Sequence, residues 1–87
     1  MTHRFKIARS AAHPLTDTLP EAVAAAAFEF INGALAENPQ RVGKPLRAPL
    51  DGTWAARRGQ YRIIDEIDDH ANSIVILQVS HRSDAYR

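Results

Sequence analysis

The feature that most constrains this fold is a long apolar stripe in the middle of the chain. Its members recur at the spacing of one helix face over residues 20–37, and this pattern predicts a single amphipathic helix. The stripe has two rows, which are Ala24, Phe28, Ile31 and Leu35, and Val23, Ala27, Phe30 and Ala34. The pair Asn38-Pro39 ends the helix, because a residue before proline is pushed out of the helical conformation. The many alanines favour a helix that lies close to a sheet.

Segments of strand-like polarity on both sides of this helix predict the sheet. One lies before the helix and three follow it, at residues 3–8, Thr53–Arg58, Gln60–Asp68 and Ser73–Ser80. The last segment is almost continuously apolar, which is typical of a central strand that is covered on both faces. We expect a short helical turn from Pro14 to Leu19 and a long irregular connection over Pro39–Gly52.

The order of these segments predicts an α+β fold of the type β-α-α-β-β-β. We expect a small, mostly antiparallel four-stranded sheet with the N-terminal helices packed on one face. A length of 87 residues allows one domain, residues 1–87. The chain has no cysteine, which excludes a disulfide framework and a zinc finger. It also lacks an apolar run long enough for a membrane span or a signal peptide, so we expect a cytoplasmic protein.

Positive charge is concentrated between residues 39 and 62. Six cations stand there against the single acid Asp51, and they are Arg41, Lys44, Arg47, Arg57, Arg58 and Arg62. Such a local excess is enough for a face that binds phosphate groups, even though the whole chain is close to neutral. A solvated basic loop would give the same pattern, so composition leaves both interpretations open.

The arrangement of the arginines is the strongest chemical signal. The four histidines have no metal-ligand spacing, and no motif of a metal, nucleotide or serine-nucleophile site is present. A hairpin between the two strands that contain them brings Arg57 and Arg58 near Arg62. An antiparallel pairing of the last two strands brings Arg82 close to Arg62, with Tyr86 four residues later. Converging guanidinium groups suit a phosphodiester, because they bind phosphate oxygens in pairs and keep their charge. Ordinary surface arginines at strand ends are the alternative interpretation.

Three motifs in this order resemble a known family. They are GKPLR at residues 43–47, ARRGQYRII at residues 56–64 and HRSDAYR at residues 81–87. Together they resemble the RelE branch of the RelE/ParE toxin superfamily, which belongs to type II toxin–antitoxin systems. The order of the predicted elements agrees with this resemblance.

The resemblance implies a function and a set of site residues. RelE-like toxins are ribosome-dependent endoribonucleases in which a ribose 2′-hydroxyl attacks the adjacent phosphate, without a metal or cofactor. The partners implied are mRNA on the ribosome and a RelB-like antitoxin. Arg62 and Arg82 match the catalytic arginines, and Tyr86 matches the tyrosine that acts on the nucleophile. The residues expected to bind RNA phosphates are Arg57, Arg58, Arg41, Lys44 and Arg47.

The chain departs from the family pattern where a proton donor is expected. The strand before the GQYR motif carries no lysine over residues 53–56. His81 is the nearby group that titrates near neutrality, so it is a candidate catalytic residue, and a strand-end residue that orients the tail is the alternative. Asp65 replaces the usual aromatic residue and shares the buried strand face with Ile63, which is costly for an unpaired carboxylate.

Two other functions fit the same motifs. A ParE-like toxin would share the fold, lack nuclease activity and act on a topoisomerase. A degraded member would only bind an antitoxin or RNA. The absence of lysines from residues 53–56 favours the ParE-like toxin, whereas Arg62, Arg82 and Tyr86 favour the nuclease.

Overall fold

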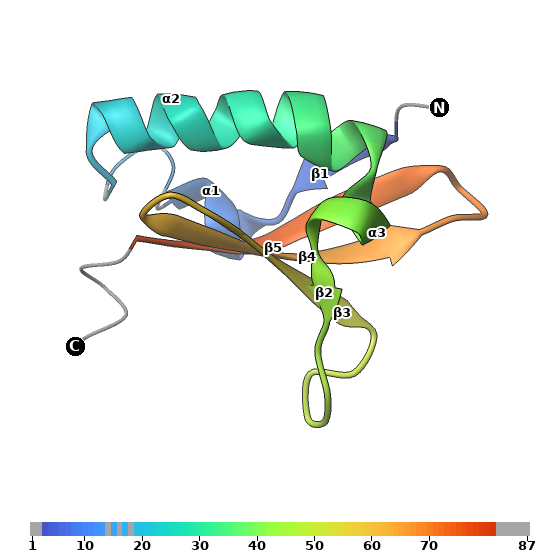
Figure 1. Ribbon diagram of the computed structural model, residues 1–87. Coiled ribbons are helices and arrows are strands. Elements are labelled where there is room, and N and C mark those ends of the chain that lie inside the picture. Colours follow the sequence, from blue (N-terminus) through green and yellow to red (C-terminus); the bar gives the residue numbers. More distant parts are fainter. Residues whose placement is uncertain (1–2, 14, 16, 18, 82–87) are drawn as a thin grey trace.

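A computed structural model describes residues 3–13, 15, 17 and 19–81 of the chain. Within these residues the protein has two layers, a five-stranded sheet and the helices that cover one of its faces (Figure 1). The helices are α1 (Arg9–His13), α2 (Glu21–Phe30) and α3 (Pro39–Val42), and a π-helical segment, Ile31–Leu35, extends α2. The strands are β1 (Arg4–Ile7), β2 (Lys44–Pro45), β3 (Thr53–Arg58), β4 (Tyr61–Asp68) and β5 (Ser73–His81). The predicted α+β class is therefore confirmed.

The strands lie in the order β1-β5-β4-β3-β2. Strand β1 pairs with β5 in parallel, and the other three pairs are antiparallel. Strand β5 has a neighbour on each side, as predicted for a central strand. The predicted cover on both faces is wrong, because the helices cover only one face of the sheet and Gln78 on the other face is exposed (Figure 1).

The predicted number of four strands is wrong, because β2 adds a fifth at the edge. It lies in the segment 39–52 that was expected to be irregular. Two residues are too few to show an alternating pattern, and Pro45 is tolerated there because an edge strand can lack one amide donor. The same segment also contains α3, which begins at a proline, a residue suited to the first turn of a helix.

The two N-terminal helices also differ from the prediction. The short helix is α1 and ends at His13, whereas the predicted turn began at Pro14, which with residues 16 and 18 lies outside the described residues. The long helix changes to π-helical geometry after Phe30. This wider turn contains Gly33, and glycine lowers the preference for a regular α-helix.

The core lies between the helices and one face of the sheet. The helical layer contributes Ala11, Ala27, Phe30, Ile31 and Leu35, and the sheet contributes Ala56, Ile63, Ile74, Ile76 and Val79. Burying one large aliphatic side chain stabilises a fold by about 1.5–3 kcal/mol. Four of the eight residues of the predicted stripe belong to this core, and Val23, Ala24 and Ala34 pack against it while partly buried. Phe28 is 47% exposed and contacts the ring of Phe5.

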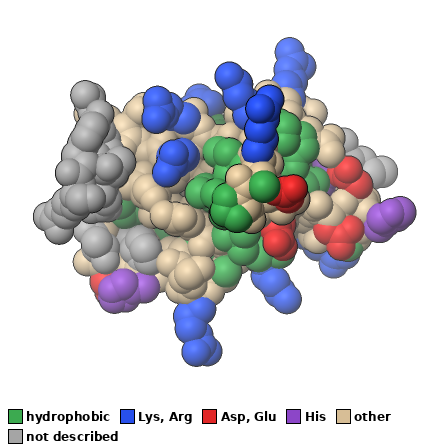
Figure 2. Space-filling model, turned by 90° about the horizontal axis from the view of Figure 1, so that it is seen from below, with side chains coloured by type: hydrophobic (Ala, Val, Ile, Leu, Met, Phe, Trp, Pro, Cys, Tyr) green, Lys and Arg blue, Asp and Glu red, His purple; other side chains and the backbone are tan. Residues whose placement is uncertain are grey.

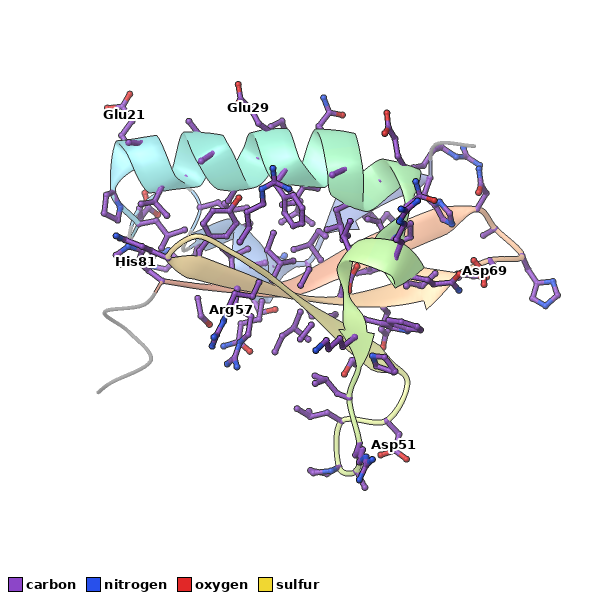
Figure 3. All side chains as sticks on the ribbon, in the orientation of Figure 1. Glu21, Glu29, Asp51, Arg57, Asp69 and His81 are labelled. Carbon is purple, nitrogen blue, oxygen red and sulfur yellow. The ribbon has the colours of Figure 1, made fainter. Side chains whose placement is uncertain are left out.

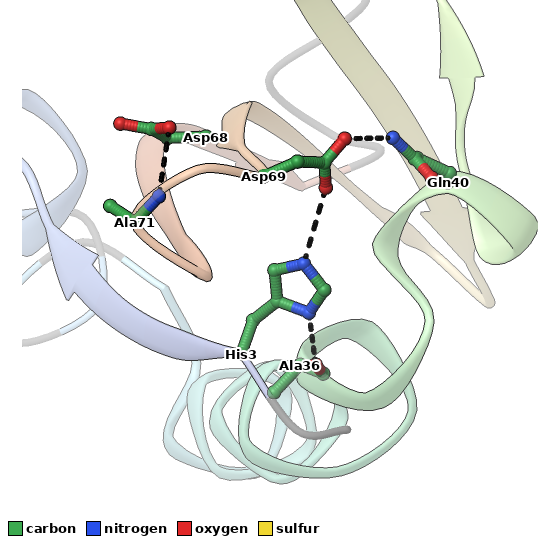
Figure 4. A network of polar contacts seen from close by, with 6 residues as sticks. All are labelled: His3, Ala36, Gln40, Asp68, Asp69 and Ala71. Atoms are coloured by element: carbon green, nitrogen blue, oxygen red, sulfur yellow. Dashed lines mark hydrogen bonds and ion pairs between the residues drawn. The ribbon is translucent and has the colours of Figure 1, made fainter.

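A polar network around His3 ties the helical layer to the far end of the sheet (Figure 4). The Nδ1 atom of His3 lies 3.2 Å from the carbonyl oxygen of Ala36, and its Nε2 lies 3.5 Å from Oδ1 of Asp69. Gln40 in α3 donates a hydrogen bond of 2.9 Å to the other oxygen of Asp69. The network therefore joins the residue before β1, the end of the long helix, α3 and the β4–β5 turn.

In the described part of the chain, no helix is long and apolar enough to cross a membrane.

Candidate phosphate-binding site

The centre of the candidate site is a pair of arginines on the face of the sheet that the helices leave uncovered. Arg57 of β3 and Arg62 of β4 are direct cross-strand partners, so their side chains leave the sheet on the same side. Figure 3 shows Arg57 on the side away from α2. Both residues are exposed, which leaves their guanidinium groups accessible to a ligand.

A tight turn fixes this pairing. Strands β3 and β4 are joined through Gly59 and Gln60, and Arg58 pairs with Tyr61 on either side of them. Gly59 has φ of +60°, a conformation that glycine adopts without the steric cost of a Cβ atom. A two-residue hairpin of this kind sets the register of both strands, and it therefore holds Arg57 opposite Arg62.

The electrostatics of the pair favour an anion. Like charges placed directly across two strands repel each other, and among the described residues no carboxylate forms an ion pair with either guanidinium. A phosphate group placed between them would remove the repulsion and accept charge-assisted hydrogen bonds from both.

The uncovered face continues beyond the pair. Arg62 also pairs with Ser80 of β5, and Gln78 donates a hydrogen bond of 2.9 Å to the hydroxyl oxygen of Ser80. The adjacent row across the sheet consists of Lys44, Ala55, Ile64 and Gln78. Figure 2 shows this face as an apolar patch with Lys and Arg side chains on several sides and Asp and Glu side chains at one edge. The sequence analysis did not predict the apolar patch or the place of Gln78 in it. Which residues of different strands lie side by side depends on the strand register, and the sequence does not give that register.

Arg58 lies on the opposite face from Arg57. Its guanidinium carbon is 5.1 Å from the centre of the Phe30 ring in α2. The neighbouring Tyr61 donates a hydrogen bond of 3.2 Å to the carbonyl oxygen of Ala26. Burial raises the pKa of the Tyr61 hydroxyl, with Arg58 lowering it and Glu29 raising it to smaller extents. The structure therefore does not bring Arg58 together with the arginine pair.

Of the three C-terminal candidate residues, the structure describes only His81. His81 pairs with Tyr61 at the end of β5, and Figure 3 shows it on the α2 side of the sheet. The structure thus separates His81 from Arg57 and Arg62 by the thickness of the sheet. Arg82 and Tyr86 lie outside the described residues.

The remaining predicted cations follow the path of the basic connection. Arg41 is exposed in α3, Lys44 is exposed in β2, and Arg47 is exposed in the loop that follows. This loop projects below the sheet in Figure 1. Hydrogen bonds from the Leu46 amide to the Thr53 carbonyl and from the Thr53 amide to the Leu50 carbonyl, at 3.0 and 3.1 Å, hold its base.

Asp65 lies on the covered face of β4, as strand alternation predicted. It is 0% exposed, and neither carboxylate oxygen has a hydrogen-bond partner among the described residues. Burial raises the pKa of Asp65 to about 7, and the opposing effect of its own backbone amide is smaller. Its direct cross-strand neighbours are Trp54 and Ile76, so this carboxyl group belongs to the core and not to the uncovered face. Nowhere in the described chain do three histidine or acidic side chains form a group able to hold a metal ion.

Comparison with known proteins identifies the relatives of this chain. The family described as the ParE toxin of type II toxin–antitoxin system, parDE, matches residues 6–86. Toxin RelG of Mycobacterium tuberculosis is 54% identical over 69 residues, which are 79% of this chain and 79% of that protein. Toxin RelE of the same organism is 49% identical over 69 residues, which are 79% of this chain and 71% of that protein. Among solved structures, the toxin–antitoxin complex RelBE2 from Mycobacterium tuberculosis matches with a TM-score of 0.91 and 44% identity, covering 94% of this chain and 100% of that one.

Proposed function

Since this chain belongs to the RelE branch of the RelE/ParE toxin superfamily, we propose that it is a ribosome-dependent endoribonuclease that cuts mRNA. Membership of this family makes it the toxin of a type II toxin–antitoxin system. The observation that carries the proposal is the exposed Arg57–Arg62 pair on the uncovered face. A nuclease of this kind needs a concentrated positive charge at one phosphate, and the pair supplies it.

The Arg57–Arg62 pair would stabilise the negative charge that forms on the scissile phosphate. When a ribose 2′-oxygen attacks the adjacent phosphorus, negative charge builds up on the non-bridging oxygens. Preorganised guanidinium groups stabilise that charge in the transition state, and loss of one such donor typically costs about 10²–10³ in rate. Arginine suits the task because it stays protonated and presents paired N–H groups.

The C-terminal segment would complete the site. We expect Arg82 to add a further phosphate contact and Tyr86 to act on the 2′-hydroxyl, as the family resemblance implies. His81 starts from the helix side of the sheet, so we expect it to orient this segment. Its role as a proton donor stays a prediction.

The other cations would guide RNA to the site. Arg41, Lys44 and Arg47 follow one another along the basic connection and are exposed. Contacts of this kind bind the phosphate backbone of any sequence and weaken as salt rises. Arg58 is also exposed, but it would meet RNA only at the hairpin tip, because its side chain turns towards Phe30.

A RelB-like antitoxin is the proposed protein partner. The RelBE2 structure that this chain resembles is a toxin–antitoxin complex. In this chain, Ile7, Leu15 and Phe28 line an apolar hollow of about 210 Å³ beside α2. Residues 15–38 carry four acids and no Lys or Arg, so an antitoxin segment with apolar and basic side chains would suit this side of the molecule.

One observation favours a second candidate function. The matching family is described by the name ParE, which fits a toxin that acts on a topoisomerase. The two relatives near 50% identity are instead named RelG and RelE, and together with the arginine pair they favour the nuclease.

A cleavage assay separates the two functions. The purified chain is added to ribosomes programmed with mRNA, and new 5′ ends are mapped. We expect cleavage by the parent chain, loss of cleavage in Arg62→Ala, and retained cleavage in Arg9→Ala, which removes an exposed arginine of α1. Intact mRNA together with inhibited topoisomerase activity would instead establish the ParE-like function.

A further inference from the structure

Lys44 shares the uncovered face with the arginine pair. It is the direct partner of Ala55 across β2 and β3, and Ala55 precedes Arg57 by two residues on the same side of β3. Diagonal neighbours of this kind in an antiparallel sheet lie about 7–8 Å apart between Cα atoms, which long side chains can bridge. Lys44 is exposed, so its ammonium group can reach the space beside Arg57.

Close backbone packing holds Lys44 in this place. A Cβ atom at Gly43 would lie 3.2 Å from the carbonyl oxygens of both Ala55 and Pro39. Glycine thus lets the chain between α3 and β2 approach β3 closely enough to form the edge pair. The methyl group of Ala55 leaves the space above it open to the lysine side chain.

The chemistry needs a group that the arginine pair cannot supply. Cleavage by a 2′-oxygen breaks the bond between phosphorus and the 5′-oxygen, and the departing oxygen needs a proton. Guanidinium groups do not release protons in proteins, whereas an ammonium group can. Among the described residues of this face, the lysines Lys44 and Lys6 carry such a group. Lys44 is the nearer one to the pair by strand order, since β2 lies next to β3 whereas β1, which carries Lys6, is the opposite edge of the sheet.

We propose that Lys44 is a catalytic residue that donates a proton to the 5′-oxygen leaving group. This inference rests on the proposed nuclease function. In the step, the 2′-oxygen forms its bond to phosphorus and its proton leaves to a base. The bond to the 5′-oxygen breaks, and that oxygen takes a proton from Nζ of Lys44. The products are a 2′,3′-cyclic phosphate and a 5′-hydroxyl, and Lys44 regains its proton from water.

The test replaces the leaving oxygen. Ribosomes are programmed with two forms of one mRNA, which differ only at the mapped cleavage position, where sulfur replaces the bridging 5′-oxygen in the second form. A thiolate leaves without a proton, so the sulfur substrate bypasses the donor. We expect Lys44→Ala to lower cleavage of the oxygen substrate by about 10²-fold or more and to cleave the sulfur substrate at nearly the parent rate.

Two further variants separate proton donation from charge. Lys44→Arg keeps the positive charge but not the releasable proton, so it should be as slow as Lys44→Ala on the oxygen substrate and rescued by sulfur. Parent activity in Lys44→Arg would overturn the proposal and leave Lys44 as a simple phosphate contact. Lys6→Ala removes an exposed lysine from β1, the opposite edge of the sheet, and should keep the parent rate.

Arg62→Ala reports on the proposed function separately. It should be slow on both substrates, because sulfur does not replace the lost stabilisation of phosphate charge. If the parent chain cleaves, Arg62→Ala does not, and Lys44→Ala is unaffected, the nuclease function stands and the role of Lys44 is refuted. If Lys44→Ala is slow on both substrates, its role in donating the proton is refuted as well.

Discussion

Arg57 and Arg58 are neighbours in the chain, yet they serve opposite faces of the sheet. Arg57 pairs with Arg62 on the uncovered face, whereas the guanidinium group of Arg58 stacks on Phe30 of the helical layer. The first arrangement concentrates like charge and serves a ligand. The second places a cation on an aromatic ring and serves the fold.

The two arginines should therefore respond differently to alanine. Arg58→Ala is expected to lower the free energy of unfolding by about 0.5–1 kcal/mol, the usual value of an exposed cation–π contact. Arg57→Ala should leave stability unchanged or slightly higher, because it relieves repulsion with Arg62, while cleavage falls by about 10²–10³-fold. Urea denaturation and the ribosome assay measure the two effects. Equal losses of stability in both variants would contradict this division.

The buried Asp65 should make stability depend on pH. The pKa of Asp65 is about 7 in the folded chain and its ordinary value is 3.8, so the folded state holds the proton more tightly than the unfolded state. The resulting stabilisation is fully present below pH 4 and is lost as pH rises towards 7. Asp65→Asn removes this titration and should be more stable than the parent at pH 8, by about 1–3 kcal/mol.

Denaturation curves at several pH values check the behaviour of Asp65. The quantity of interest is the difference in unfolding free energy between parent and variant, which should grow from pH 4 to pH 8. Asp51→Asn, in the exposed loop before β3, is the matched control and should show no such growth. A constant difference for Asp65→Asn would mean that the carboxyl group finds a partner when it ionises.

Much of this fold follows from local patterns in the sequence. Alternation over residues 61–68 predicts β4 and places Asp65 on the covered side, and the apolar run 73–80 predicts a strand with neighbours on both sides. Strand β2 was not predictable, since two residues carry no period and their pairing with β3 depends on the close approach of Gly43. The change to π-helical geometry after Phe30 was likewise not predictable. The spacing of the apolar stripe is compatible with both an α-helix and a short π-helical segment.

The site could be predicted in composition but not in arrangement. The arginines of the GQYR and ARRG motifs were expected to converge, and the hairpin does bring Arg57 to Arg62. Grouping Arg58 with them was an interpretation based on nearness in sequence, whereas side chains of successive strand residues point to opposite faces. The position of Lys44 beside Ala55 depends on β2, so sequence reasoning placed it only in a basic loop.

The His3 network should contribute to stability unequally through its members. His3 contacts the carbonyl of Ala36 and its side chain is 13% exposed, whereas the Asp69 side chain is 64% exposed. We expect His3→Ala to cost about 0.5–1.5 kcal/mol, as for one net hydrogen bond, and Asp69→Ala to cost less because its contacts are solvated. Thermal melts of both single variants and the double variant measure the two costs and their coupling. A larger loss in Asp69→Ala would show that the turn depends on Asp69 itself.

Two glycines offer a matched test of backbone strain. A Cβ atom at Gly59 or at Gly33 would meet no atom within 4 Å, but only Gly59 has a positive φ, at +60°. Gly59→Ala should therefore destabilise the fold by about 1–2 kcal/mol through strain alone. Gly33 lies in the helical segment Ile31–Leu35. Gly33→Ala should stabilise the fold by up to about 1 kcal/mol, since alanine restricts the unfolded chain and favours a helix. Urea denaturation gives both values, and Gly59→Ala should in addition slow mRNA cleavage, because the turn at Gly59 holds Arg57 opposite Arg62. Opposite signs of the two stability changes are the expected result, and a stable Gly59→Ala variant would show that the hairpin accepts another turn without losing its register.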